Sequence, residues 1–196
     1  MKQKNGTRTI VITGLLLALE IIFQVIGNFV AIGPANINLT LVTVAIAGIL
    51  CGPMSAAILG FFNGIMALFS PSTIAIFMPI SPYGTVLVCL VKCTVAGIVS
   101  AYVFRWLRKK NQILALIVAS ALVPVVNTGI FCLGALAFFQ DWLKVETSKG
   151  GFANIGLFLI LAVVGINFLV EFASTTLITP TVGTILLKRE EKIQNK

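Results

Sequence analysis

The sequence predicts an all-α integral membrane protein with six transmembrane helices and both termini in the cytoplasm. The 196-residue chain is 58% hydrophobic and only 10% charged, with a mean hydropathy of +1.06. A soluble domain carries about a quarter charged residues, so the surface of this chain is expected to face lipid. Several apolar runs reach the about 20 residues that a spanning helix needs. The length predicts one compact membrane domain over residues 1–196, without room for a separate soluble catalytic domain.

The first half of the chain predicts three helices, over residues 8–32, 38–51 and 53–70. The sequence GPAN at 33–36 breaks the first from the second. Gly52 and Pro53 separate the second from the third, because Gly ends helices and Pro suits the first turn of the next. The second helix is short.

Residues 70–82, SPSTIAIFMPISP, contain three prolines and predict a re-entrant or surface loop. This loop is apolar enough to lie near the membrane and to cover a bound ligand. The second half predicts helices over 83–107, 112–139 and about 153–187. Pro124 is expected to kink the fifth helix.

Lysine and arginine indicate the orientation of the chain. They gather near the N-terminus, at 105–110 and at 188–196, which six spans place on one side of the membrane. The segment 140–151, expected on the other side, has two lysines balanced by two acidic residues. Because cytoplasmic loops carry the excess of Lys and Arg, the basic side is predicted to be cytoplasmic.

Composition argues against most enzymes. The chain has no histidine, so it cannot form a Ser-His-Asp triad or an HExxH zinc site. It has no GxxxxGK[ST] loop for ATP, and its acidic residues are few and scattered. The four cysteines lie in apolar runs and predict small buried side chains, without disulfides or a metal site. No cofactor is expected. The net charge of +8 sits at helix ends, which does not indicate a nucleic-acid partner.

Lys92 is the only charged residue between Glu20 and Arg105. At 1.5 Å per residue it lies about 14 Å into the fourth helix, near the middle of the bilayer. A charge there is costly without a partner. Two interpretations stay open: an ion pair with Glu20 or Glu171, or a cationic anchor for an anionic ligand.

Three asparagines are expected at membrane depth: Asn63 and Asn167 near the middle, and Asn127 in the outer half, just after Pro124. Each can form an interhelical hydrogen bond or contact a ligand. In the first helix, Gly14 and Ala18 form a small-xxx-small pair that lets another helix approach. Glu20, two residues beyond Ala18, is expected to face nearly the opposite way, into the bundle.

The sequence resembles the substrate-binding S components of energy-coupling factor (ECF) vitamin transporters. The resemblance covers nearly the whole chain. It rests on Gly14 and Ala18, on the run AIAGILCGPMSAAILGFFNGIMALFSP at 45–71, on VPVVNTGIF at 123–131, and on six spans. The 45–71 hairpin and the Asn-Thr-Gly segment resemble the branch associated with pantothenate. In that branch a basic residue, usually arginine, stands near the position of Lys92.

The resemblance implies a vitamin-binding subunit in the plasma membrane of a bacterium. A separate ECF module, made of a transmembrane coupling protein and two ATPases, supplies the energy and is expected to dock at Gly14 and Ala18. The subunit is then expected to topple in the membrane and carry its site inward. The expected substrate-binding residues are Lys92, Asn127, Asn167, Asn63, Thr128, Tyr83 and Phe77.

Other functions remain compatible with the sequence. The ligand can be another carboxylate vitamin, namely niacin, biotin, lipoate or a folate. The protein can also be a stand-alone secondary carrier, although neither a coupling-ion site nor an inverted repeat is evident. A third alternative is a scaffold subunit that transports nothing.

Overall fold

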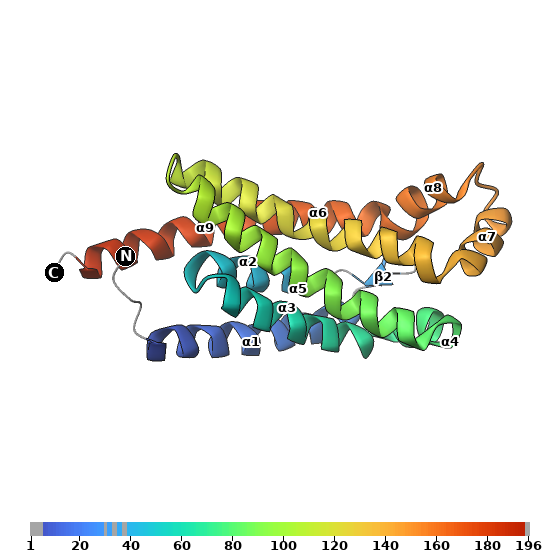
Figure 1. The fold of residues 1–196 in the computed structure, drawn as a ribbon, viewed down its shortest axis with the longest axis horizontal. Coiled ribbons are helices and arrows are strands. Elements are labelled where there is room, and N and C mark those ends of the chain that lie inside the picture. The colour runs from blue at the N-terminus through green and yellow to red at the C-terminus, as the bar shows by residue number, and fades with distance from the viewer. Residues whose placement is uncertain (1–5, 30, 33–34, 37–38, 195–196) are drawn as a thin grey trace.

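The computed structural model describes residues 6–29, 31–32, 35–36 and 39–194 as an elongated bundle of helices that run along its long axis (Figure 1). The long elements are α1 (Gly6–Phe29), α3 (Pro53–Leu68), α5 (Pro82–Leu107), α6 (Gln112–Phe138) and α9 (Gly165–Gln194). The shorter helices are α2 (Thr40–Leu50), α4 (Met78–Ile80), α7 (Gln140–Lys149) and α8 (Ile155–Phe158). Two π-helical segments, η1 (Thr73–Phe77) and η2 (Leu159–Val164), and two strands, β1 (Ala31–Ile32) and β2 (Ala35–Asn36), complete the described elements.

The short helix α2 forms the centre of the bundle. All of its 11 residues are buried. A helix that is apolar on every side is stable only when it is surrounded, and α2 contacts α1, α3, α5, α6 and α9. The second predicted helix is therefore confirmed as short, and its 11 residues are too few to cross a bilayer by themselves.

The boundaries of the long helices follow local capping signals. Ser81 caps α5 by accepting a hydrogen bond from the amide of Gly84 at 3.3 Å, and Pro82 follows at the first helical position. Asn111 caps α6 through the amides of Ile113 and Leu114. At the α2–α3 turn, Gly52 has φ +102°, and a Cβ there would collide with the guanidinium of Arg105.

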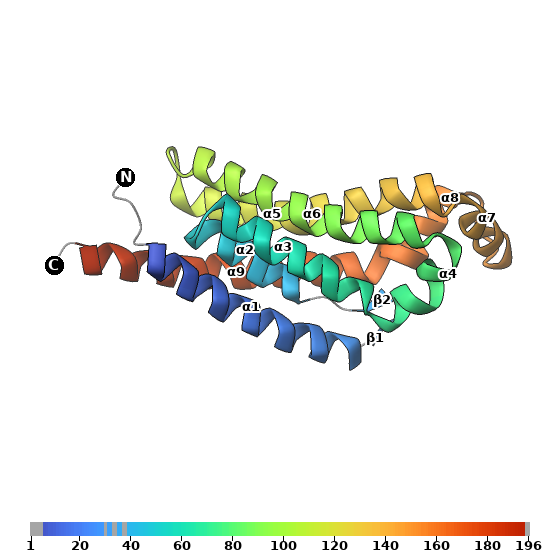
Figure 2. The same ribbon diagram turned by 60° about the horizontal axis from the view of Figure 1, so that its bottom comes forward.

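The structure corrects the prediction for residues 70–82. The segment is helical, through η1 and α4, because a π-helical turn accommodates the chain between two prolines. It is bent by 64° from α3, so the expected interruption of a straight span is confirmed, and the bend fits either a broken span or a re-entrant segment. Figure 2 shows α4 at the end of the bundle, beside the start of α5.

Two other boundaries differ from the prediction. Ala31 and Ile32, expected to end the first helix, pair with β2 as a short antiparallel strand. The GPAN break lies partly outside the described residues. Residues 140–149, expected to connect two helices, form α7, which Asp141 at its first turn and Lys149 at its last favour through the helix dipole. The sixth predicted helix, 153–187, corresponds to α8, η2 and α9 in succession, and α9 continues beyond it to Gln194.

The described residues contain four helices that are long and apolar enough to cross a membrane: Gly6–Gly27, α5, α6 and Ile155–Arg189. There are up to five if the bent pair of α3 and Thr73–Ile80 counts as one span. α6 continues through Pro124 as one helix. These helices make the chain a multi-pass membrane protein.

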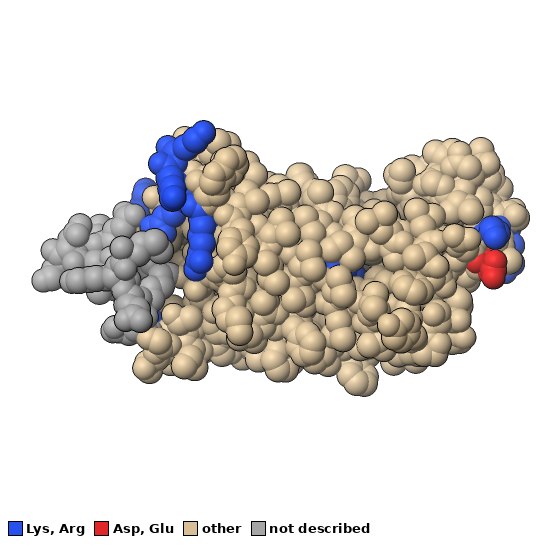
Figure 3. All heavy atoms as spheres, in the orientation of Figure 1, with Lys and Arg blue, Asp and Glu red and all other residues tan. Residues whose placement is uncertain are grey.

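Charged side chains gather at the two ends of the molecule (Figure 3). One end carries the basic cluster, which we define as Arg105, Arg108, Lys109 and Lys110 around the α5–α6 turn. The start of α1 and the end of α9 lie at the same end (Figure 1). The opposite end carries α7, where Lys144 and Lys149 pair with Asp141 and Glu146. The side of the bundle between them, in this view, is almost entirely uncharged.

Candidate substrate-binding cavity

A cavity of about 130 Å³ lies among α1, α3, α5, α6 and α9, in the half of the bundle nearer α4 and α7. The polar side chains that line it come from α1, α5, α6, α9, η1 and the connection between α3 and η1, whereas α3 contributes Ala67. They are Gln24, Ser70, Ser72, Thr73, Thr85, Cys89, Lys92, Asn127, Thr128, Asn167 and Glu171. Apolar walls with a few convergent polar groups are typical of small-molecule sites.

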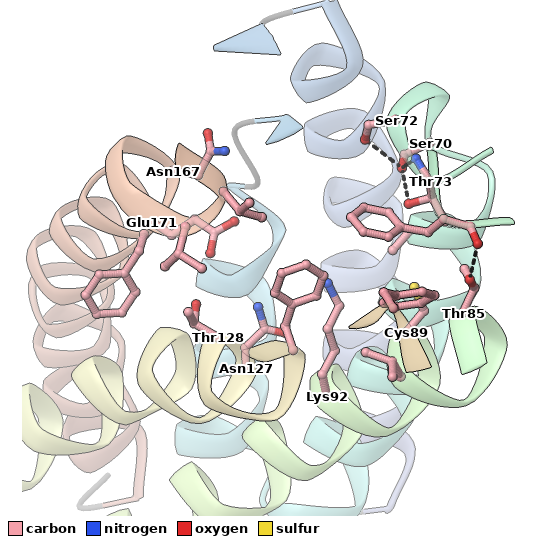
Figure 4. A pocket seen from close by; sticks show the side chains of 18 of the residues that line it. Ser70, Ser72, Thr73, Thr85, Cys89, Lys92, Asn127, Thr128, Asn167 and Glu171 are labelled. Carbon is pink, nitrogen blue, oxygen red and sulfur yellow. Dashed lines mark hydrogen bonds between the residues drawn. The ribbon is translucent and has the colours of Figure 1, made fainter. Parts of the chain in front are cut away.

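Lys92 extends its amine from α5 into this cavity (Figure 4). Its Nζ lies 5.3 Å from the centroid of the Phe131 ring, at cation–π distance. Among the described residues, no carboxylate oxygen lies within 4.0 Å of that amine. Neither of the two ion pairs considered for Lys92 is therefore formed in this structure, and its charge is directed at the cavity.

Asn127 connects the cavity to a buried polar network. The thiol of Cys93 donates to the side-chain oxygen of Asn127 at 3.3 Å and lies 3.7 Å from that of Asn63. Asn63 in turn donates to the hydroxyl of Thr40 on α2. Because the Cys93 thiol donates to its Oδ1, Asn127 presents its amide nitrogen from α6 beside Lys92 (Figure 4).

The α9 side of the cavity presents oxygen atoms that can accept hydrogen bonds. Asn167 and Glu171 are one helical turn apart, and each is 8% exposed. The buried Oδ1 of Asn167 has no hydrogen-bond partner among the described residues. Figure 4 shows Glu171 reaching from α9 into the space in front of Lys92 and Asn127.

Hydroxyl groups and aromatic rings position η1 at the cavity. Ser70 donates to the hydroxyl of Thr73 at 2.7 Å, and Thr85 donates to the backbone oxygen of Phe77 at 2.9 Å. The Phe77 ring packs against Phe131, Phe139 and Trp142, with centroids 5.8, 5.1 and 5.5 Å away. These contacts hold η1 against α6 and α7 as one wall of the cavity.

The structure brings together five of the seven residues expected to bind substrate. Lys92, Asn127, Thr128, Asn167 and Phe77 all line the cavity. Asn63 is fully buried and does not line the cavity; the Cys93 thiol links it to the lining residue Asn127. Tyr83 is 74% exposed on the outside of α5 and does not line it.

Sequence reasoning missed the hydroxyl groups Ser70, Ser72, Thr73 and Thr85, and the ring of Phe131. A signal for three of them was present, since SPST at 70–73 gathers polar residues beside a proline within an otherwise apolar stretch. Phe131 carried no such signal, because an aromatic residue in an apolar helix is normally a packing residue.

The pair Gly14 and Ala18 lies away from the cavity, on the outer face of α1. Both residues are exposed, and a Cβ at Gly14 would meet no atom within 4 Å. Glu20 faces the opposite way, fully buried, and accepts a hydrogen bond from Thr43 at 3.4 Å. The opposed faces predicted for this helix are confirmed, and Glu20 does not line the cavity.

Comparison with known proteins agrees with this arrangement. The profile of the family described as "ECF transporter, substrate-specific component" matches residues 8–183. The chain is 26% identical to the pantothenate transporter PanT of Leuconostoc mesenteroides subsp. mesenteroides over 207 aligned positions, which cover 97% of each chain. No solved structure matches the chain significantly.

Proposed function

This chain belongs to the family of substrate-specific components of ECF transporters, and we propose that the vitamin it binds is pantothenate. The family gives it a substrate-binding role in membrane transport, as a partner of an ECF module. Its similarity to PanT along nearly the full length supports pantothenate as the ligand.

The observation that carries the proposal is the amine of Lys92, without a carboxylate partner among the described residues and directed into a cavity with amide and hydroxyl groups. Pantothenate has one carboxylate, one amide and two hydroxyl groups. Its carboxylate meets Lys92, and its other polar groups meet Asn127, Thr128 and Asn167, while Phe77 packs on its apolar part. A charge-assisted hydrogen bond in a largely dry site is stronger than a neutral one.

The proposal includes an orientation in the plasma membrane of a bacterium. The basic cluster and both termini face the cytoplasm in this proposal, since the start of α1, the α5–α6 turn and the end of α9 lie at the same end of the bundle and cytoplasmic segments carry the excess of Lys and Arg. The cavity then opens toward the outside, since it lies in the half of the bundle away from the basic cluster. Residues 70–82 form its outer cover.

Energy for uptake comes from a separate ECF module, a transmembrane coupling protein with two ATPases. This module docks on the face of α1 that carries Gly14 and Ala18. Small side chains at these positions allow close approach of a partner helix. The exposed side chains of α1 around them, from Ile10 to Ile26, are uncharged.

The test is direct identification of the ligand. The protein is purified in detergent, the bound small molecules are released and identified by mass spectrometry, and pantothenate affinity is measured by calorimetry. We expect about one pantothenate per chain. Release of niacin, biotin, lipoate or a folate, with no heat of pantothenate binding, would show that the assignment of pantothenate as the substrate is wrong. Active uptake by the chain alone in liposomes would instead indicate a secondary carrier.

A further inference from the structure

We propose that Glu171, together with Asn167, forms an acceptor wall that selects ligands with hydroxyl or N–H donors remote from their carboxylate. This inference rests on the proposed function and adds the residues that separate pantothenate and biotin from niacin, lipoate and the folates. We use the name acceptor wall for these two residues of α9.

The geometry separates the cavity into two chemically different sides. Lys92 and the amide of Asn127 are hydrogen-bond donors that come from α5 and α6. Glu171 and the Oδ1 of Asn167 come from α9 (Figure 4). The buried Oδ1 of Asn167 has no hydrogen-bond partner among the described residues. At Glu171, the hydrogen bond formed within the described part of the chain reaches the backbone oxygen, from Ser174, and leaves the carboxylate to the cavity. Both side chains are more than nine-tenths buried.

Buried acceptors without donors are costly, about 1–3 kcal/mol each and more when charged. A ligand that supplies donors at this side removes that cost, and a ligand without them leaves it in place. A site built around hydrogen-bonding groups therefore discriminates strongly against analogues that lack the matching group.

The acceptor wall divides the carboxylate vitamins by chemistry. Pantothenate offers two hydroxyls and an amide N–H, and biotin offers two ureido N–H groups. Lipoate and nicotinate have no such donor beyond the carboxylate end. A folate brings a second carboxylate, which would be repelled by Glu171. The wall thus favours pantothenate or biotin over the other three.

The experiment measures binding of pantothenate and of its two single-deoxy analogues to the purified full chain. Wild type is compared with Glu171→Gln and with Glu20→Gln, which changes a buried glutamate outside the cavity. Wild type should prefer pantothenate over at least one deoxy analogue by about 10- to 100-fold, as expected for a hydrogen bond to a charged group. Glu171→Gln should reduce this ratio to about threefold or less, and Glu20→Gln should keep it.

An unchanged ratio in Glu171→Gln, with pantothenate still bound, overturns the acceptor wall and leaves the proposed function intact. If Glu171→Gln does not fold, the affinities of wild type for lipoate, nicotinate and pantothenate are compared instead. The acceptor wall is overturned if lipoate or nicotinate binds as tightly as pantothenate, and it is supported if both bind more weakly. If wild type binds no pantothenate, the proposed substrate is wrong. Biotin binding then tests the acceptor wall. Weaker biotin binding by Glu171→Gln than by wild type supports the wall. Equal biotin affinity of the two proteins, or no biotin binding by wild type, overturns it.

Discussion

Lys92 illustrates how a single residue in a membrane helix depends on its neighbours. Its amine has a phenylalanine ring at 5.3 Å and no carboxylate within 4.0 Å among the described residues. An ammonium in hydrocarbon is costly, but here it faces a cavity with amide, hydroxyl and carboxylate groups. Its cost is therefore reduced by solvent or ligand in that cavity, and a bound carboxylate compensates it further.

Replacement of Lys92 tests its role as an anchor. We expect Lys92→Ala to weaken pantothenate binding by about 30- to 1,000-fold, because a buried charge on the ligand loses its partner. Lys92→Arg keeps the charge and should lose less, although its planar group is bulkier. Calorimetry with the two variants measures both effects, and melting temperatures in detergent report folding.

The opposite pattern would assign Lys92 to an ion pair. In that case Lys92→Ala lowers the melting temperature, and adding Glu171→Gln restores part of it. Panthenol, in which an alcohol replaces the carboxylate of pantothenate, gives a second check. If Lys92 anchors the carboxylate of the ligand, panthenol should bind wild type poorly and should bind Lys92→Ala with nearly the same affinity.

At the scale of elements, α3 and α5 position the residue that bears the amine. Gly60 and Gly64 lie one turn apart on α3 and contact the backbone of α5 at Cys93 and Cys89. A Cβ at Gly64 would lie 2.6 Å from the carbonyl oxygen of Cys89. Backbone cannot yield as a flexible side chain does, so this close approach sets the position of the α5 turn that carries Lys92.

We therefore expect Gly64→Ala to separate α3 from α5, to destabilise the protein by about 1–3 kcal/mol, and to weaken ligand binding. Gly129→Ala on α6 is the matched control, since a Cβ there meets nothing within 4 Å. It should leave stability unchanged or slightly higher, given the helix propensity of alanine. Thermal unfolding in detergent compares the two, and equal melting temperatures would contradict the role of Gly64.

The outer face of α1 gives a prediction about the partner. Replacing Gly14 and Ala18 by leucine adds bulk where the isolated chain has open space. Pantothenate binding by the purified protein should survive, and uptake by the complete transporter should fall. Gly129→Leu, another exposed position, serves as the control for added bulk in lipid. Undiminished uptake by the double variant would show that the ECF module docks at another surface.

For the whole molecule, the distribution of charge between the two ends predicts its orientation. Lys144 on α7 belongs to the end proposed to face outward, and Lys109 belongs to the basic cluster. In intact cells, a membrane-impermeant thiol reagent should label Lys144→Cys and should label Lys109→Cys only after permeabilisation. Wild type, with its four native cysteines, gives the background. Labelling of Lys109→Cys in intact cells, with Lys144→Cys labelled only after permeabilisation, would show that the proposed orientation is inverted.

Much of this protein was predictable from the sequence because apolar runs and their interruptions are local signals. Length of run and Gly-Pro breaks predicted the long apolar helices and the short second helix, and the helical spacing of Gly14, Ala18 and Glu20 predicted the opposed faces of α1. The polar residues Lys92, Asn127 and Asn167 were noticeable because a polar group in an apolar helix needs a partner or a ligand.

Only the tertiary structure decided which of these polar residues share a cavity. Asn63 and Asn127 are alike in sequence, yet only Asn127 lines the cavity, whereas the amide of the fully buried Asn63 donates to Thr40 on α2. Glu20 and Glu171 are likewise both buried, but only Glu171 lines the cavity. The physical reason is that depth along a helix follows from counting residues, whereas the direction of a side chain toward a neighbour follows from how all the helices pack together.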